Sequence, residues 1–102
     1  MNFLQNIFFG KSNQLQEFLQ QGAVIVDVRT PQEFSSGHVN GSKNIPLNIL
    51  LSNVEEIKRL GKPIITVCQS GMRSGSAKSF LQSKGIKVIN GGPWSGLNKL
   101  LQ

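Results

Sequence analysis

Buried strands give the plainest signal in the pattern of apolar and polar positions. Residues 23–28 read Ala-Val-Ile-Val-Asp-Val, and residues 63–67 read Pro-Ile-Ile-Thr-Val. Both runs are short, nearly continuous and rich in β-branched side chains, which is typical of strands buried on both faces of a sheet. A third run at 86–89 and a short one at 42–45, ended by Pro46, complete the predicted strands.

Helical spacing of apolar residues predicts the segments that connect these strands. Leu15, Phe18 and Leu19 lie on one face of a helix at 12–22, which Gly22 ends. The other expected helices are a short one at 31–34 capped by Thr30, one at 47–60 broken at 52–53, one at 73–84 stopped by Gly85, and one at 93–101 preceded by a turn at Gly91-Gly92.

Alternation of strands and helices predicts an α/β fold with a parallel sheet of about four to five strands and helices on both faces. The 102 residues fit one domain, 1–102, in which residues 1–10 are a possible N-terminal extension. Functional side chains in such sheets collect beyond the carboxyl ends of the strands. Cys68 follows one strand end, and Asp27 and Arg29 lie at another.

Composition narrows the class of partner. The net charge is +6, but the 11 basic residues are scattered, with one local cluster at 58–62, and there is no Tyr. The pattern lacks the basic and aromatic interleaving of nucleic-acid binding, so we expect a solvated surface that draws small anions and no nucleic-acid partner. No run approaches the roughly 18 apolar residues of a membrane span, and no signal-peptide pattern opens the chain, so no membrane association is predicted.

Cys68 is the only cysteine, and it lies between a predicted strand and a Gly/Ser-rich loop that opens a helix. A strand, a tight loop and a helix N-terminus form a nest of backbone N–H groups, which stabilises a thiolate. The alternative is a small buried apolar residue at a strand end. Arg73 follows Cys68 by five residues, with Gly71 between the two, and this arrangement favours the reactive thiol. A single free thiol suits a reducing compartment such as the cytoplasm.

Several motifs occur together in the chain: residues 27–34, 37–39, 41–42 and 44–46, the loop 68–74, and Gly91-Gly92. In this order they resemble the single-domain rhodanese (thiosulfate sulfurtransferase-like) family over residues 23–97. The resemblance implies a central parallel sheet flanked by helices, and sulfur transfer through a persulfide on a cysteine, here Cys68.

The chain departs from the family pattern in three places. Asn40 stands where Pro is common, and Trp94 comes early while Leu97 occupies the usual aromatic position. The first ten residues do not read as the family's usual first strand. None of these departures touches the Cys68 loop, but the last two bear on strand count and edge packing.

The loop supplies the expected substrate contacts. Amides of residues 69–74 would surround the sulfur, and Gly71 would relieve the tight turn. Arg73 would bind the departing oxyanion, unless it is an ordinary surface helix residue. Ser70 and Ser74 would hold an anion or cap the helix, and Gln69 and Met72 would shape the mouth of the pocket. The expected donor is thiosulfate or a related sulfane sulfur, and the expected acceptor is cyanide in vitro or a small or protein thiol in the cell.

Other polar residues have supporting roles in this interpretation. Asp27, Arg29 and Glu33 fit a structural network, including an Arg–Glu pair, better than acid–base catalysis. His38, the sole histidine, fits a hydrogen-bonding post better than a base. Neither metal-ligand spacing nor a nucleotide-binding loop is present, so no metal or cofactor is predicted.

Two other classes of function remain open from sequence. A cysteine phosphatase or arsenate reductase also uses Cys and Arg, but with five intervening residues, whereas four separate Cys68 from Arg73. The shorter loop makes a smaller cradle, better matched to one sulfur. A non-enzymatic persulfide carrier or interaction module is the second alternative, for which the apolar residues at 3–9 would dock a partner unless they cover the sheet edge.

Overall fold

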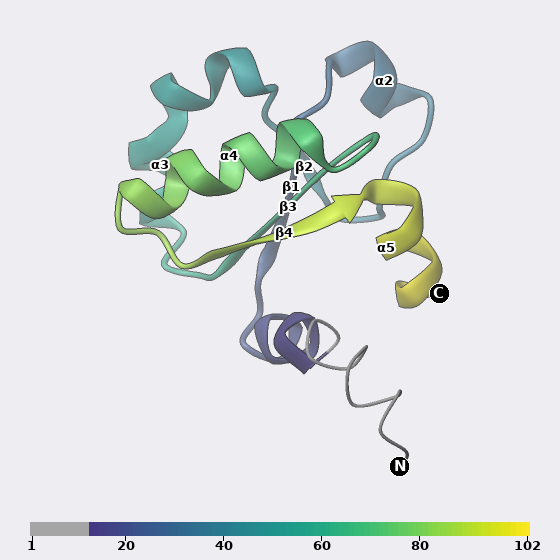
Figure 1. Cartoon of the computed structure of the whole chain (residues 1–102), viewed down its shortest axis with the longest axis horizontal. Helices are drawn as coiled ribbons and strands as arrows, with labels where there is room; N and C mark the ends of the chain where they lie inside the picture. Colours follow the sequence, from purple (N-terminus) through teal and green to yellow (C-terminus); the bar gives the residue numbers. More distant parts are fainter. Residues whose placement is uncertain (1–12) are drawn as a thin grey trace.

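The computed structural model describes residues 13–102, in which strands alternate with helices (Figure 1). The predicted roles of residues 1–10, as an extension, a docking surface or a cover of the sheet edge, lie outside these residues. A helix at 13–20 is followed by β1 (Val24–Asp27), α2 (Pro31–Ser35), β2 (Lys43–Asn44), the 3-10 helix η1 (Leu47–Asn53), α3 (Val54–Arg59), β3 (Ile64–Cys68), α4 (Met72–Ser83), β4 (Val88–Pro93) and α5 (Trp94–Leu101).

The four described strands form one parallel sheet in the order β2-β1-β3-β4. Val26 pairs with Thr66 and Asp27 with Val67, so β1 and β3 end at the same edge. The predicted α/β class and parallel sheet are confirmed. Within residues 13–102 no strand precedes β1.

Two apolar cores lie on opposite faces of the sheet. Val26 and Ile64 pack into the core beneath α3 and α4, whereas their neighbours Ile25 and Ile65 pack against Phe18 of the first helix. Figure 1 shows α3 and α4 on one side of the strands and the first helix on the other. Successive residues of a strand point to opposite faces, so burial on both sides explains the continuous apolar runs in the sequence.

The last strand differs from the prediction. The sequence places a strand at 86–89 and a turn at Gly91-Gly92, but β4 runs from Val88 to Pro93 and contains both glycines. Thr66 of β3 pairs with Asn90 and Val67 with Gly92, which leaves Gly91 as an extra residue in a bulge. A Cβ on Gly91 would lie 2.7 Å from Ile65 Cγ2, so close approach to β3 accounts for this glycine, and the predicted turn is wrong.

None of the helices within residues 13–102 combines the length and apolar character needed to cross a bilayer.

Candidate active site

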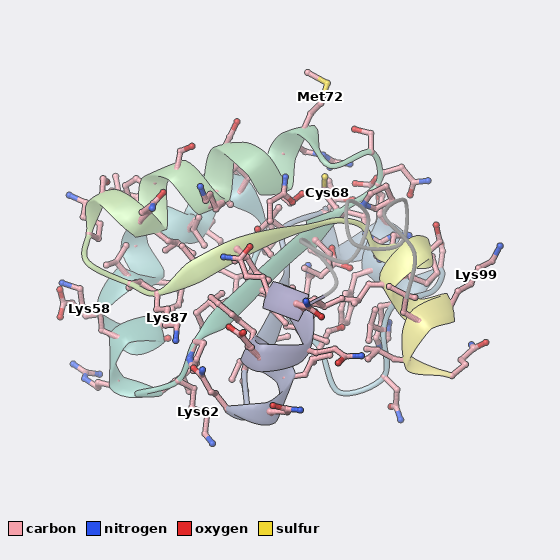
Figure 2. The ribbon with its side chains drawn as sticks, turned by 60° about the horizontal axis from the view of Figure 1, so that its bottom comes forward. Lys58, Lys62, Cys68, Met72, Lys87 and Lys99 are labelled. Carbon is pink, nitrogen blue, oxygen red and sulfur yellow. The ribbon has the colours of Figure 1, made fainter. Side chains whose placement is uncertain are left out.

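Cys68 is the last residue of β3, at the carboxyl edge of the sheet, and α4 begins four residues later at Met72. Gly71 is the N-cap of α4 and has φ of 98°, a conformation that glycine adopts without strain. Figure 2 shows Cys68 and the outward-pointing Met72 at the end of the molecule opposite Lys58 and Lys62. The side chain of Cys68 is fully buried, at 0% exposure.

Three groups contact the sulfur. The Gly71 N–H donates to Cys68 Sγ at 3.0 Å and the Ser74 N–H at 3.3 Å, while Ser74 Oγ also lies 3.3 Å from Sγ. Only part of the predicted ring of amides at 69–74 therefore makes a hydrogen bond to the sulfur. The geometry is that of a small anion nest at the start of a helix.

Burial and hydrogen bonding act in opposite directions on this thiol. Burial by itself raises the pKa of Cys68, because it penalises the charged form. The Ser74 hydroxyl and the amides of Ser74 and Gly71, with a smaller effect of the nearby Ser70 amide, together outweigh burial, so the pKa of Cys68 lies below the ordinary value for cysteine. The arrangement favours a thiolate at this position.

Arg73 and Glu33 form a charged pair at the rim of the site. Arg73 Nη1 and Nη2 donate to Glu33 Oε1 and Oε2 at 2.8 and 2.9 Å. Glu33 also completes a capping box, in which its Oε1 accepts from the Thr30 N–H at 3.1 Å. Arg73 first, and the Thr30 amide next, lower the pKa of Glu33 to about 2, and Glu33 in turn raises the pKa of Arg73.

The predicted network paired Glu33 with Arg29, but the arginine that forms the ion pair with Glu33 is Arg73. Arg29 reaches only the main-chain carbonyl of Glu33, at 3.2 Å, because Asp27 occupies most of its guanidinium. Arg29 Nη2 donates to Asp27 Oδ2 at 2.7 Å and to the Gly37 carbonyl at 2.7 Å. Its Cζ lies 4.8 Å from the centre of the Trp94 ring. Arg29 therefore ties the end of β1 to the 37–38 loop and to α5.

The remaining residues of the prediction lie near the loop or apart from it. His38 Nδ1 donates to the Phe34 carbonyl at 2.8 Å, and its ring stacks on Phe34 at 3.7 Å. None of these contacts involves Cys68. Gln69 and Ser70 are exposed above the buried sulfur. Met72 is 80% exposed, so it lies outside the packed core and beside the loop.

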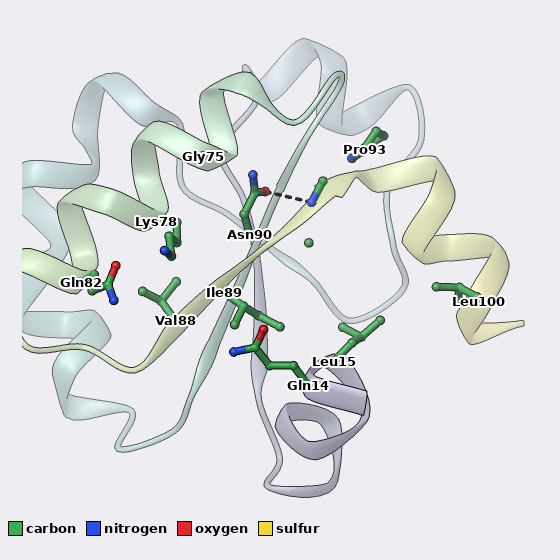
Figure 3. A pocket seen from close by; sticks show the side chains of 12 residues that line it. Gln14, Leu15, Gly75, Lys78, Gln82, Val88, Ile89, Asn90, Pro93 and Leu100 are labelled. Atoms are coloured by element: carbon green, nitrogen blue, oxygen red, sulfur yellow. Dashed lines mark hydrogen bonds between the residues drawn. The ribbon is translucent and has the colours of Figure 1, made fainter. Parts of the chain in front are cut away.

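Asn90 is a neighbour of the site that the sequence interpretation missed. Its Oδ1 accepts from the Gly92 N–H at 2.9 Å, the bond drawn as a dashed line in Figure 3, and from Ser74 Oγ at 2.7 Å. Its Nδ2 donates to the Gly71 carbonyl at 3.1 Å. The available signal was a polar residue at the end of a strand, directly before Gly91-Gly92. Within residues 13–102, no three His, Cys, Asp or Glu side chains gather as a metal site would require.

Comparison with known proteins assigns the family. The Rhodanese-like domain family model matches residues 11–95. The chain therefore belongs to the rhodanese-like domain family, as the motifs around Cys68 predicted.

Individual relatives agree with this assignment. The chain is 43% identical to the uncharacterized protein YqhL of Bacillus subtilis over 66% of its own length and 52% of YqhL, so it spans about half of that protein. It is 38% identical to thiosulfate sulfurtransferase GlpE of Pseudomonas fluorescens, over 74% of this chain and 69% of GlpE. A crystal structure of a rhodanese-related protein from Thermoplasma volcanium superposes with a TM-score of 0.69 at 30% identity, covering 83% of this chain and 85% of that one.

Proposed function

We propose that this protein is a sulfurtransferase that carries a sulfane sulfur as a persulfide on Cys68. The observation that supports this most directly is the set of contacts to Cys68 Sγ at 3.0–3.3 Å, which stabilise an anionic sulfur at a strand end. The similarity to proteins named thiosulfate sulfurtransferase supports thiosulfate as the donor.

In the first half-reaction, the Cys68 thiolate attacks the outer sulfur of thiosulfate. The S–S bond of thiosulfate breaks, sulfite leaves with the bonding pair, and Cys68 retains a persulfide anion. The total charge is the same before and after, so no proton or redox partner is required. In the second half-reaction an acceptor, cyanide in vitro or a thiol in the cell, takes the outer sulfur and regenerates the thiolate.

Arg73 binds the departing oxyanion in this proposal. A guanidinium has five N–H donors, and Glu33 occupies two of them, so donors remain for sulfite. Glu33 thereby holds the guanidinium at the rim while leaving it able to bind an anion. Ser70 and Gln69, exposed on the loop, and Met72 beside it would contact the donor or the acceptor.

Burial of the sulfur sets a condition on both half-reactions. Because Cys68 has 0% exposure, a donor reaches Sγ only after the groups that cover the sulfur move aside. The same observation favours a second candidate function, a persulfide carrier whose sulfur becomes accessible on contact with a protein donor or acceptor. Either role requires a reduced thiol, which supports a reducing compartment such as the cytoplasm.

Intact-protein mass after brief exposure to thiosulfate tests the proposal. The wild-type protein should gain one sulfur, about 32 Da for a persulfide, and cyanide should remove it. Cys68→Ser is the matched control, since Cys68 is the only cysteine, and should gain nothing.

The same experiment with a persulfidated protein as donor separates the two candidates. Loading by thiosulfate together with thiocyanate formation supports the enzyme, whereas loading by the protein donor alone supports the carrier. No adduct from either donor would overturn the proposed chemistry.

A further inference from the structure

The hydroxyl of Ser74 has one proton and two neighbours that can accept it. Ser74 is fully buried, its Oγ lies 2.7 Å from Asn90 Oδ1, and the same Oγ lies 3.3 Å from Cys68 Sγ. A serine hydroxyl donates one hydrogen bond and accepts two. Which neighbour receives the proton therefore depends on what each of them can donate.

The orientation of the Asn90 carboxamide is fixed by two main-chain groups. The Gly92 N–H donates to the carboxamide oxygen at 2.9 Å (Figure 3), and the carboxamide nitrogen donates to the Gly71 carbonyl at 3.1 Å. If the carboxamide were rotated by 180°, its NH2 group would face the Gly92 N–H and its oxygen would face the Gly71 carbonyl. Neither contact could then be a hydrogen bond. The atom that faces Ser74 is thus an oxygen without a proton, so the proton of any hydrogen bond between the two side chains must come from Ser74.

The ionisation of Cys68 changes this arrangement. In the thiol form, the S–H can donate to Ser74 Oγ while Ser74 donates to Asn90, and all three groups are satisfied. In the thiolate form, Cys68 Sγ and Asn90 Oδ1 are both acceptors, and the single proton of Ser74 can serve only one of them. We infer that Asn90 is a positioning residue that competes with the Cys68 sulfur for the Ser74 hydroxyl proton, and so limits how readily the thiol ionises.

The charged groups around the site do not provide this coupling. They are Arg73 on α4, Glu33 on α2, the pair Asp27 and Arg29 at the end of β1, and Lys78 of α4, which lines the groove beside Asn90. None of them hydrogen-bonds with Ser74 or Asn90 in the described part of the chain. Replacing Asn90 by Ala therefore removes the competing oxygen without changing any charge.

The inference deepens the proposed function. It rests on that function only in taking the Cys68 thiolate to be the nucleophile of sulfur transfer. Its test is the pH dependence of alkylation of Cys68 by iodoacetamide, which requires no sulfur donor. The midpoint of this dependence reports the ionisation of the sulfur. A protein that alkylates as expected but fails to transfer sulfur would contradict the proposed function and leave this inference standing.

Asn90→Ala should lower the midpoint by about 0.5–1 pH unit, the shift that one ordinary hydrogen bond to the thiolate corresponds to. Asn90→Asp, which keeps an oxygen at the same place and strengthens its hold on the hydroxyl, should raise the midpoint and serves as the second variant if Asn90→Ala does not fold. Both substitutions are repeated in a Ser74→Ala background, where Asn90→Ala should have no effect and Asn90→Asp only the effect of its charge.

Equal shifts with and without Ser74 would overturn the inference, because they would show that Asn90 acts by supporting the loop. A rise of the midpoint in Asn90→Ala would overturn it in the same way, because it would show that the hydrogen bond to Gly71 matters more than the competition. Absence of any shift when Asn90→Ala is made in the otherwise wild-type protein, which keeps Ser74, would also overturn it.

Discussion

Arg73 and Glu33 lie 40 residues apart in the sequence and face each other through two parallel hydrogen bonds of 2.8 and 2.9 Å. Glu33 also accepts from Thr30 at the start of α2, so one carboxylate caps a helix and holds the arginine beside the Cys68 loop. Both side chains of the pair are about one-third exposed, at 37% and 34%. The pair is therefore placed to orient an arginine at the rim of the site, where water screens its contribution to stability.

Acid should break this pair in a predictable pH range. The pKa of Glu33 is about 2 in the folded protein, below the value of about 4.3 for an unperturbed carboxyl. The stabilisation is therefore complete above about pH 5 and is lost as the pH falls toward the folded pKa. In thermal unfolding between pH 5 and pH 2, Glu33→Gln should show a flatter loss of stability than the wild type. Arg73→Gln should flatten it too, because Arg73 is the main cause of the shift; a wild-type slope in Glu33→Gln would contradict this assignment.

Replacing Arg73 by Lys should impair sulfur transfer while keeping the charge. A lysine lacks the planar fork that binds an oxyanion and Glu33 together. We expect kcat/KM for thiocyanate formation from thiosulfate to fall about 10- to 100-fold, or about 1.4–2.7 kcal/mol of transition-state stabilisation. Arg59→Lys, the same exchange at an exposed position in the last turn of α3, is the matched control and should leave turnover unchanged. Wild-type turnover in Arg73→Lys would rule out the proposed role.

Asp27→Asn should destabilise the fold far more than any change at the rim. Asp27 and Arg29 are 0% and 3% exposed, and Asp27 accepts from Arg29 Nε, Nη2 and the main-chain N–H. Neutralising Asp27 leaves a buried guanidinium without its counter-charge, a change that costs about 3–5 kcal/mol in other proteins. Urea unfolding at neutral pH measures the loss. A loss below about 1 kcal/mol would show that Trp94 and the main-chain carbonyls satisfy Arg29 alone.

Two glycines near the C-terminus should respond oppositely to alanine. In Gly91→Ala the new Cβ would meet Ile65 Cγ2 at 2.7 Å and the Thr66 carbonyl oxygen at 3.0 Å, and we expect a loss of about 1–3 kcal/mol from overpacking. Gly96, in α5, has no atom within 4 Å of the corresponding position. Gly96→Ala should gain about 0.5–1 kcal/mol from helix propensity. Urea unfolding measures the change in the free energy of unfolding of both variants. No change in Gly91→Ala would mean that the bulge can relax to accommodate the methyl group.

Local patterns predicted what depends on neighbours in the sequence. The run at 24–28 showed a strand buried on both faces, and Thr30 as a cap before Pro31 supplied the start of α2. The loop around Cys68 was equally visible, because its glycine and its helix start follow directly in the chain.

Features that depend on a neighbouring strand or helix were not predicted. Gly91 reads as a turn residue until Ile65 of β3 is seen beside it. Asn90 gains its role from Ser74, 16 residues away, and Glu33 from Arg73, 40 residues away. Such pairs leave no periodic signal, because neither partner is required by the element in which it lies.

The contacts in and around the site also differ in sequence separation, that is, in the length of the loop that each contact closes. The donors to Cys68 Sγ come from residues three and six positions away, whereas Ser74–Asn90 and Arg73–Glu33 span 16 and 40. Closing a short loop costs little entropy, so we expect the nest to form as soon as β3 meets the start of α4, before the outer contacts assemble. The groups that stabilise the sulfur thus lie within the contiguous segment 68–74, and the sheet contributes a rigid support for that segment.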